Sequence, residues 1–377
     1  MSNNVDFKGD VDKNSHWERF FGFTLNINPI FNLIGIIGLS ITRRKNFRFI
    51  KTDKFNLYTW AVLAVLGIIS IISSYDKGTA ISSFFIPFAF FWLYILGRWY
   101  IKKPVRLLKD MTRGTALMGF LTIVFYLFRV EVIWQGVELI SSFGRGDRAY
   151  ILGIGDNGLG VLLQAGIVAS LGLIFVLKKR NERIEYIIYC VLSLGGLIIT
   201  KSRGAMVGSA AAIFLLIFVV SWKILLIFGG ITGISFKIIP GFLDRVKSIV
   251  SLETHMNRIR IYKGVLKMIK DHLWFGTGPG NFHDIYQKYR LPGEFENANT
   301  PHSNYLKIIS GWGIISGIIL YGWIFYIMIR GWFQGGTKYQ KIIVAVLVSF
   351  WVHVLINDLF AAYSAILLGC LDNKYFK

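Results

Sequence analysis

Long apolar runs dominate this chain and constrain its fold more than any other feature. A membrane-spanning helix needs about 17–25 mostly apolar residues, and eleven stretches of the sequence come close to that description. They are residues 24–42, 57–75, 79–97, 114–133, 157–177, 184–200, 204–220, 224–241, 303–329, 341–357 and 359–371. The sequence therefore predicts an all-α, polytopic membrane protein with about eleven spans.

The composition supports a membrane protein and argues against a soluble enzyme. Hydrophobic residues make up 54% of the 377-residue chain and charged residues only 17%, whereas soluble domains have about 45–50% and about 25%. The net charge of +21 would suggest a nucleic-acid partner in a soluble protein. Here the basic residues are spread through the loops between apolar runs, so we expect no nucleic-acid partner.

The basic residues also predict the orientation. They concentrate in residues 43–56, 98–113, 178–183 and 330–341, and loops rich in Lys and Arg stay in the cytoplasm. We therefore expect a multi-pass protein of the cytoplasmic (inner) membrane, with its C-terminus inside and its N-terminus outside.

This orientation divides the chain into four parts. A polar tail (1–23) precedes eight spans (24–241), a large loop outside the membrane (242–302) and the C-terminal spans (303–377). Within the loop, residues 257–272 place Tyr262 and other apolar residues at helical spacing. We expect an amphipathic helix lying along the outer membrane surface.

Several positive residues fall on the predicted outer face, against the usual loop bias. Arg203 sits in a short turn between two apolar helices, and an arginine within a bilayer costs about 2.5–3.5 kcal/mol at the helix centre. An anionic partner would offset this cost, because guanidinium groups match the paired oxygens of a phosphate or diphosphate. The spacing of His272 and His283 is not typical of a metal site. The polar and positive positions gathered on this face are Arg145, Arg148, Asp156, Asn157, Lys201, Ser202, Arg203, Arg258, Arg260, His272, His283 and His302.

Short motifs in this region resemble the O-antigen ligase and polymerase superfamily, which includes teichuronic acid and exopolysaccharide polymerase relatives. The resemblance covers about residues 145–330, and it depends on the order of the motifs more than on any single one. In order they are Asp156-Asn157 preceded by Arg148, Ser202-Arg203-Gly204, Arg258 followed by Tyr262, Gly276-Thr277-Gly278-Pro279-Gly280-Asn281-Phe282, His302-Ser303-Asn304-Tyr305-Leu306 and Gly311-Trp312-Gly313.

The resemblance implies a metal-independent, inverting glycosyltransferase that needs no cofactor. It would move a glycan from an undecaprenyl diphosphate carrier to a glycan or lipid-glycan acceptor at the outer face of the cytoplasmic membrane. Arg203 and Arg258 would bind the diphosphate and stabilise its growing charge, and His302 would act as general base on the acceptor hydroxyl. The further substrate-binding positions that it implies are Arg148, Arg260, Asn157, Tyr262, Gly278 and Gly280.

Two alternatives stay open at this point. A ligase and a polymerase would share this donor and differ only in the acceptor. A transporter or flippase of lipid-linked glycans is the alternative from another functional class. Transporters often place ionisable residues at the bilayer midplane and show internal repeats, but here the charge lies in loops and the spans show no twofold pattern.

Overall fold

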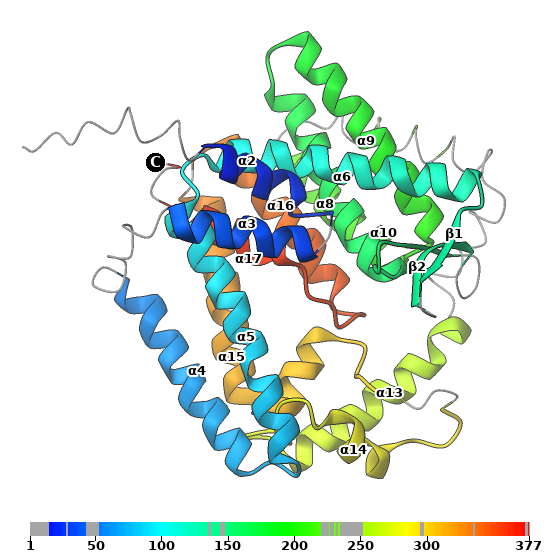
Figure 1. Ribbon diagram of the computed structural model, residues 1–377. Helices are drawn as coiled ribbons and strands as arrows, with labels where there is room; N and C mark the ends of the chain where they lie inside the picture. The colour runs from blue at the N-terminus through cyan, green and yellow to red at the C-terminus, as the bar shows by residue number, and fades with distance from the viewer. Residues whose placement is uncertain are drawn as a thin grey trace, which may run out of the picture.

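The protein is almost entirely helical in a computed structural model (Figure 1). The structure describes residues 15–27, 29–42, 53–134, 137–143, 148–219, 252–294, 298–334 and 336–373, with isolated positions beyond them. The helices are α2 (Ser15–Thr24), α3 (Pro29–Thr42), α4 (Lys54–Ile72), α5 (Lys77–Ile95), a π turn (Leu96–Tyr100), α6 (Pro104–Leu127), α8 (Asp156–Val176), α9 (Arg180–Thr200), α10 (Arg203–Val219), α13 (Leu252–Asp271), α14 (Phe282–Tyr286), a 3-10 turn (Gln287–Tyr289), α15 (Asn304–Phe333), α16 (Lys338–His353) and α17 (Ala362–Leu371). The strands are β1 (Glu131–Trp134), β2 (Val137–Phe143) and β3 (Arg148–Ile151).

The centre of the bundle is α8, which packs against α6, α9, α10 and α16. Small residues allow these helices to approach closely, as is common where helices meet inside a membrane. A side chain at Gly119 of α6 would collide with the Leu192 backbone, and one at Gly166 of α8 would collide with Thr115. The interior of α8 is apolar except for a few small or amide side chains such as Gln164, which is fully buried.

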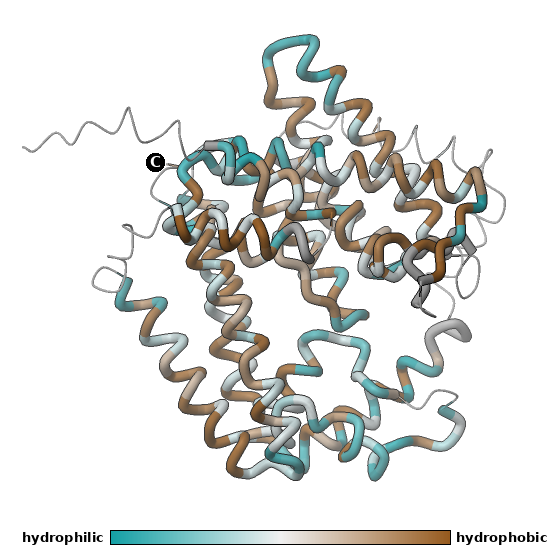
Figure 2. Tube along the Cα trace, viewed as in Figure 1, coloured by the Kyte–Doolittle hydropathy of each residue, from teal (hydrophilic) through white to brown (hydrophobic). Residues whose placement is uncertain are grey.

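A second group of helices leans against this bundle. The helices α4 and α5 form a hairpin that packs with α15, while α13 and α14 lie near the turn of that hairpin (Figure 1). Figure 2 shows apolar residues along α4, α5 and α15, and more polar residues around α13 and α14. The buried face of α13, which includes Ile261 and Val265, packs against Phe282 and Tyr286.

Five described helices are long and apolar enough to cross a bilayer, by length and composition. They are α4, α5 with its π turn, α8, α9 and α15. Large apolar side chains also face outwards, for example Val65 and Ile72 of α4, at 57% and 68% exposure. A contiguous apolar surface of this kind is stable in lipid and not in water. The chain is therefore a multi-pass membrane protein.

The region predicted as the first span differs from the prediction. Residues 24–42 do not form one helix, because α2 ends at Thr24 and α3 begins at Pro29. The helix α2 also starts inside the segment predicted to be a polar tail, and it packs on α3 as the first arm of a hairpin. Pro29 lacks an amide hydrogen and fits the start of a helix. The Asn32 side chain donates to the Leu25 carbonyl across the break.

Three further boundaries depart from the sequence prediction. The helix α6 begins at Pro104, inside the predicted basic loop, where Lys109 pairs with Glu182 and Arg113 with Glu185. The predicted loop 134–156 contains part of a three-stranded antiparallel sheet, in the order β1-β2-β3, so the fold is not purely helical. The last predicted span is a helix of only 10 residues, α17. The predicted span 224–241 lies outside the described residues, apart from isolated positions.

Candidate functional site

The last residue of α16 and its connection to α17, residues 353–361, lie where segments that carry several predicted site residues come together. We call these residues the α16–α17 junction, and the junction points from the bundle towards α13 (Figure 1). Where α16 ends, its last carbonyl groups lose their helical partners. The amide of Asn304 donates to two carbonyls that lie just after α16, at 2.9 Å from the Val354 oxygen and 3.1 Å from the Asn357 oxygen. The start of α15 is thereby fixed to the junction.

His302 lies immediately before this anchored helix start and has an unusual backbone. Its φ angle is +50°, in the left-handed region, which non-glycine residues rarely adopt. The His302 carbonyl accepts a hydrogen bond of 3.1 Å from the Tyr262 hydroxyl, and the imidazole is partly exposed. Such strained backbones persist where their surroundings hold them in place, and they cluster at functional sites.

Arg258 and Tyr262, one turn apart on α13, face the same junction. The Tyr262 hydroxyl lies 3.4 Å from the Leu355 carbonyl. Burial raises the pKa of this phenol, Asp358 acts in the same direction and the positive Arg258 opposes it. The charge of Arg258 also acts on the imidazole of His353. Arg258 therefore lies within electrostatic range of Tyr262 and of His353.

Arg203 approaches the junction from the bundle. It is the first residue of α10, after a turn in which Lys201 adopts a left-handed conformation and the Ser202 hydroxyl donates to the Asn157 side chain at 3.0 Å. The next residue, Gly204, lies against the junction. An added Cβ there would be 2.5 Å from the His353 ring and 2.6 Å from the Asn357 amide nitrogen.

The junction thus adjoins segments that carry five of the predicted residues: Arg203, Arg258, His302, Asn157 and Tyr262. The residues of the junction itself, above all His353, Asn357 and Asp358, were not predicted as site residues. A signal was present in the sequence, because three polar residues interrupt two apolar runs there. Ionisable residues within membrane segments are costly and therefore point to function.

Arg260 and Arg148 belong to other parts of the structure. The Arg260 guanidinium donates to the Gly293 carbonyl at 2.8 Å and so holds the loop after the 3-10 turn. Arg148 begins β3, and its side chain is outside the description. Their predicted contacts to substrate stay predictions.

The glycine loop that contains Gly278 and Gly280 packs into a break in α15. At Gly313 the backbone leaves the helix, with φ of +83°, and this frees carbonyl groups in the preceding turn. The Thr277 amide donates to the Ser310 carbonyl at 2.8 Å, and the Gly278 amide to the Gly311 carbonyl at 3.0 Å. These amides already have protein partners, so the loop serves as a joint between helices. A direct role of Gly278 and Gly280 in substrate binding stays a prediction.

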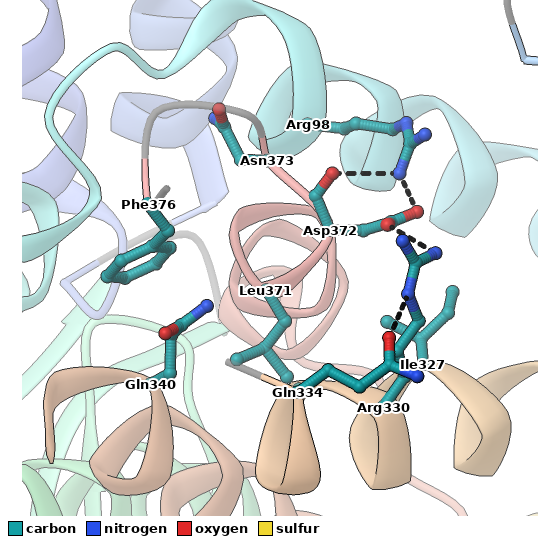
Figure 3. Close-up of a pocket in the computed structure, with 10 residues that line it drawn as sticks. Arg98, Ile327, Arg330, Gln334, Gln340, Leu371, Asp372, Asn373 and Phe376 are labelled. Atoms are coloured by element: carbon teal, nitrogen blue, oxygen red, sulfur yellow. Dashed lines mark hydrogen bonds and ion pairs between the residues drawn. The ribbon is translucent and has the colours of Figure 1, made fainter. Parts of the chain in front are cut away.

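A polar pocket of about 450 Å³ lies near the C-terminal ends of α15 and α17. Figure 3 shows Arg98 and Arg330 on either side of the Asp372 carboxylate. Arg98 also pairs with Asp53 at 2.6 Å. Two guanidinium groups and two carboxylates balance each other, and they connect α4, α5, α15 and α17. Both arginines of this pocket already pair with carboxylates of the protein.

No group of three or more potential metal ligands occurs among the His, Cys, Asp and Glu residues that the structure describes. The polar groups at the junction are guanidinium, imidazole, amide and phenol groups, together with the Asp358 carboxylate, which pairs with Lys307 at 3.5 Å. These groups suit the recognition of oxygen-rich anions and of hydroxyl groups.

Residues 188–322 match the family described as O-antigen ligase. This match supports placing the chain in the O-antigen ligase and polymerase superfamily. The matched segment contains Arg203, Arg258, Tyr262 and His302, whereas Asn157 and the junction lie outside it. No curated protein matches the chain. The family match supports glycan transfer of the ligase or polymerase type, on lipid-linked glycan substrates.

Proposed function

We propose that the protein transfers a glycan from an undecaprenyl diphosphate carrier to a glycan or lipid-glycan acceptor at the outer face of the cytoplasmic membrane. The observation that carries this proposal is the common position of three segments around the α16–α17 junction. Arg203 begins α10 beside Gly204 and His353, Arg258 acts on His353, and His302 precedes the anchored start of α15. Two positive groups and one imidazole would thus be available in one place.

The chemistry follows from the groups present. The acceptor hydroxyl attacks the anomeric carbon of the donor sugar, and the bond from that carbon to the diphosphate oxygen breaks. His302 takes the proton of the hydroxyl, since imidazole exchanges protons near neutral pH. Arg203 and Arg258 stabilise the negative charge that grows on the departing lipid diphosphate. Attack from the face opposite the leaving group inverts the anomeric centre.

An apolar groove next to the junction supports a lipid-linked donor. Its volume is about 570 Å³, and its lining is almost entirely apolar. Two lining residues, Tyr305 and Leu355, belong to the segments that carry His302 and the junction. A diphosphate at the arginines would therefore have an apolar surface beside it for its polyprenyl chain. The groove is lined by Leu215, Tyr305, Phe325, Met328, Ile329, Trp332, Phe333, Val344, Val348, Trp351, Val352 and Leu355.

The test is an assay of the purified protein in lipid vesicles with an undecaprenyl diphosphate glycan and candidate acceptors, with and without excess EDTA. We expect a new glycosidic bond in both conditions, because the two arginines supply the positive charge. A product with one added glycan indicates a ligase, and a ladder of products indicates a polymerase. Movement of the donor across the membrane without a new bond would reject the proposal in favour of a flippase. Loss of activity in EDTA would reject metal independence.

A further inference from the structure

His353 is a buried histidine to which the proposed chemistry gives no role. It is the last residue of α16 and has no exposed surface. A buried polar group destabilises a protein unless it is hydrogen-bonded, and the His353 Nδ1 atom lies 3.1 Å from the Gln164 side-chain oxygen of α8. The Gln164 side chain is also fully buried. The interior of the bundle therefore contains a hydrogen-bonded histidine–glutamine pair.

The helix α10 is shaped to fit this pair. Gly204 and Gly208 are four residues apart and share one face of α10, a spacing that allows two membrane helices to pack closely. A Cβ at Gly204 would be 2.5 Å from His353 Cδ2 and 2.6 Å from its Nε2 atom. A Cβ at Gly208 would be 2.3 Å from the Ser349 carbonyl and 3.0 Å from the Gln164 side-chain oxygen. The imidazole thus fills the space that the absent side chain at 204 leaves.

This packing bears directly on Arg203, because Arg203 is the residue before Gly204. A shift of the imidazole would move the first turn of α10, and the Arg203 backbone with it. The other end of the same short segment holds Asn304 through the Asn357 carbonyl, at 3.1 Å. His353 therefore lies between the backbone that carries Arg203 and the backbone that carries His302.

We infer that His353, held by Gln164, is a positioning residue that sets the place of Arg203 for the lipid diphosphate. The inference depends on the proposed function, since it assigns a reason for the geometry of that site. His353 does not touch substrate in this account. It acts through Arg203, and its replacement should change the same kinetic parameters as a change at Arg203.

The principal experiment compares His353→Leu with His353→Asn in the vesicle assay. Leucine removes the hydrogen bond to Gln164, whereas the asparagine amide can replace the Nδ1 donor. We expect His353→Leu to lower kcat/KM for the donor by about tenfold, as coupled neighbours commonly do, and to leave KM for the acceptor unchanged. We expect His353→Asn to stay within about threefold of the wild type.

A second set of variants, made in an Arg203→Lys protein, separates a positioning role of His353 from a general destabilisation of the fold. If His353 acts through Arg203, its effect should shrink to less than about threefold in an Arg203→Lys protein. Asn26→Leu is the matched control, because it breaks another buried bond, 2.9 Å long, to Thr115. We expect this control to lower thermal stability and to keep kcat/KM. Wild-type kinetics of His353→Leu, or a fully additive loss in the Arg203→Lys background, would overturn the inference.

Two variants that change side-chain size at the contact between Gly204 and His353 keep the inference testable if His353→Leu does not fold. Gly204→Ala should lose activity because its methyl group collides with the imidazole, and His353→Ala in the same chain should restore part of it. Absence of any recovery would overturn the inference. Wild-type transfer is measured in every series. If the wild type transfers no glycan, the proposed function fails, whereas wild-type transfer with an unaffected His353→Leu variant rejects only the positioning role.

Discussion

Hydrogen bonds to backbone carbonyls hold individual residues in place at the α16–α17 junction. His302 keeps its left-handed backbone with help from the Tyr262 hydroxyl, which contacts both the His302 and Leu355 carbonyls. Tyr262 thereby joins α13 to α15 and to the junction. One phenol thus contributes to the position of the proposed base.

We expect Tyr262→Phe to lower the transfer rate about two- to tenfold, because a single hydrogen bond contributes about 0.5–1.5 kcal/mol. The measurement is kcat of the purified variant with saturating donor and acceptor. Tyr289→Phe is the matched control, since it removes a hydroxyl that bonds Asp271 at 2.9 Å on an exposed face. Equal losses in both variants would contradict a specific role for Tyr262.

The sequence could suggest part of this geometry. Arg203, Arg258 and His302 were indicated because positive residues on the outer face need a partner and because the motif order resembles a family. His353 lies near the end of an apolar run, and its polarity was a signal that the sequence prediction did not use. Its role depends on Gly204 and Gln164, which are far away in the sequence, and only the packing of α8, α10 and α16 brings them together.

At the scale of elements, the break in α15 determines how the loop after α13 docks. The Gly278 amide bonds the Gly311 carbonyl, and a Cβ at Gly278 would be 2.3 Å from Ser74 at the end of α4. This loop therefore connects the α4–α5 hairpin to the broken helix. Its three glycines meet a packing requirement, because each has positive φ and little room for a side chain.

We expect Gly278→Ala to destabilise the folded protein by about 2–3 kcal/mol more than Gly336→Ala. Both glycines have positive φ, at +95° and +60°, but a Cβ at Gly336 meets no atom within 4 Å. The difference between the variants therefore isolates the cost of the collision. Thermal unfolding in detergent measures it, and equal melting temperatures would show that the loop is not a tight joint.

The helices themselves were the more predictable elements. Runs at 57–75, 157–177 and 184–200 correspond to α4, α8 and α9 within a few residues, because long apolar segments have few other stable structures in a bilayer. The break at 25–28, the sheet after α6 and the kink at Gly313 were not predicted. Each depends on local hydrogen bonds or on tertiary packing, to which hydropathy is insensitive.

For the whole molecule, the positions of the charged residues are consistent with the predicted orientation in the membrane. The balanced cluster of Arg98, Arg330, Asp53 and Asp372 lies at the end that the basic loops predict to be cytoplasmic. The junction points from the bundle towards α13 (Figure 1), and the segments that carry Arg203, Arg258 and His302 adjoin it. We propose an anion site at the junction, whereas the four charges of the ionic cluster balance one another.

The central claim is that Arg203 and Arg258 hold a lipid diphosphate while His302 activates the acceptor. Its most direct test measures donor binding and glycan transfer together in the purified alanine variants at these three positions. We expect each variant to lose at least about 100-fold in transfer. We expect the two arginine variants to bind the donor weakly, and His302→Ala to bind it with nearly wild-type affinity. Wild-type transfer in any two of the three variants would contradict the account.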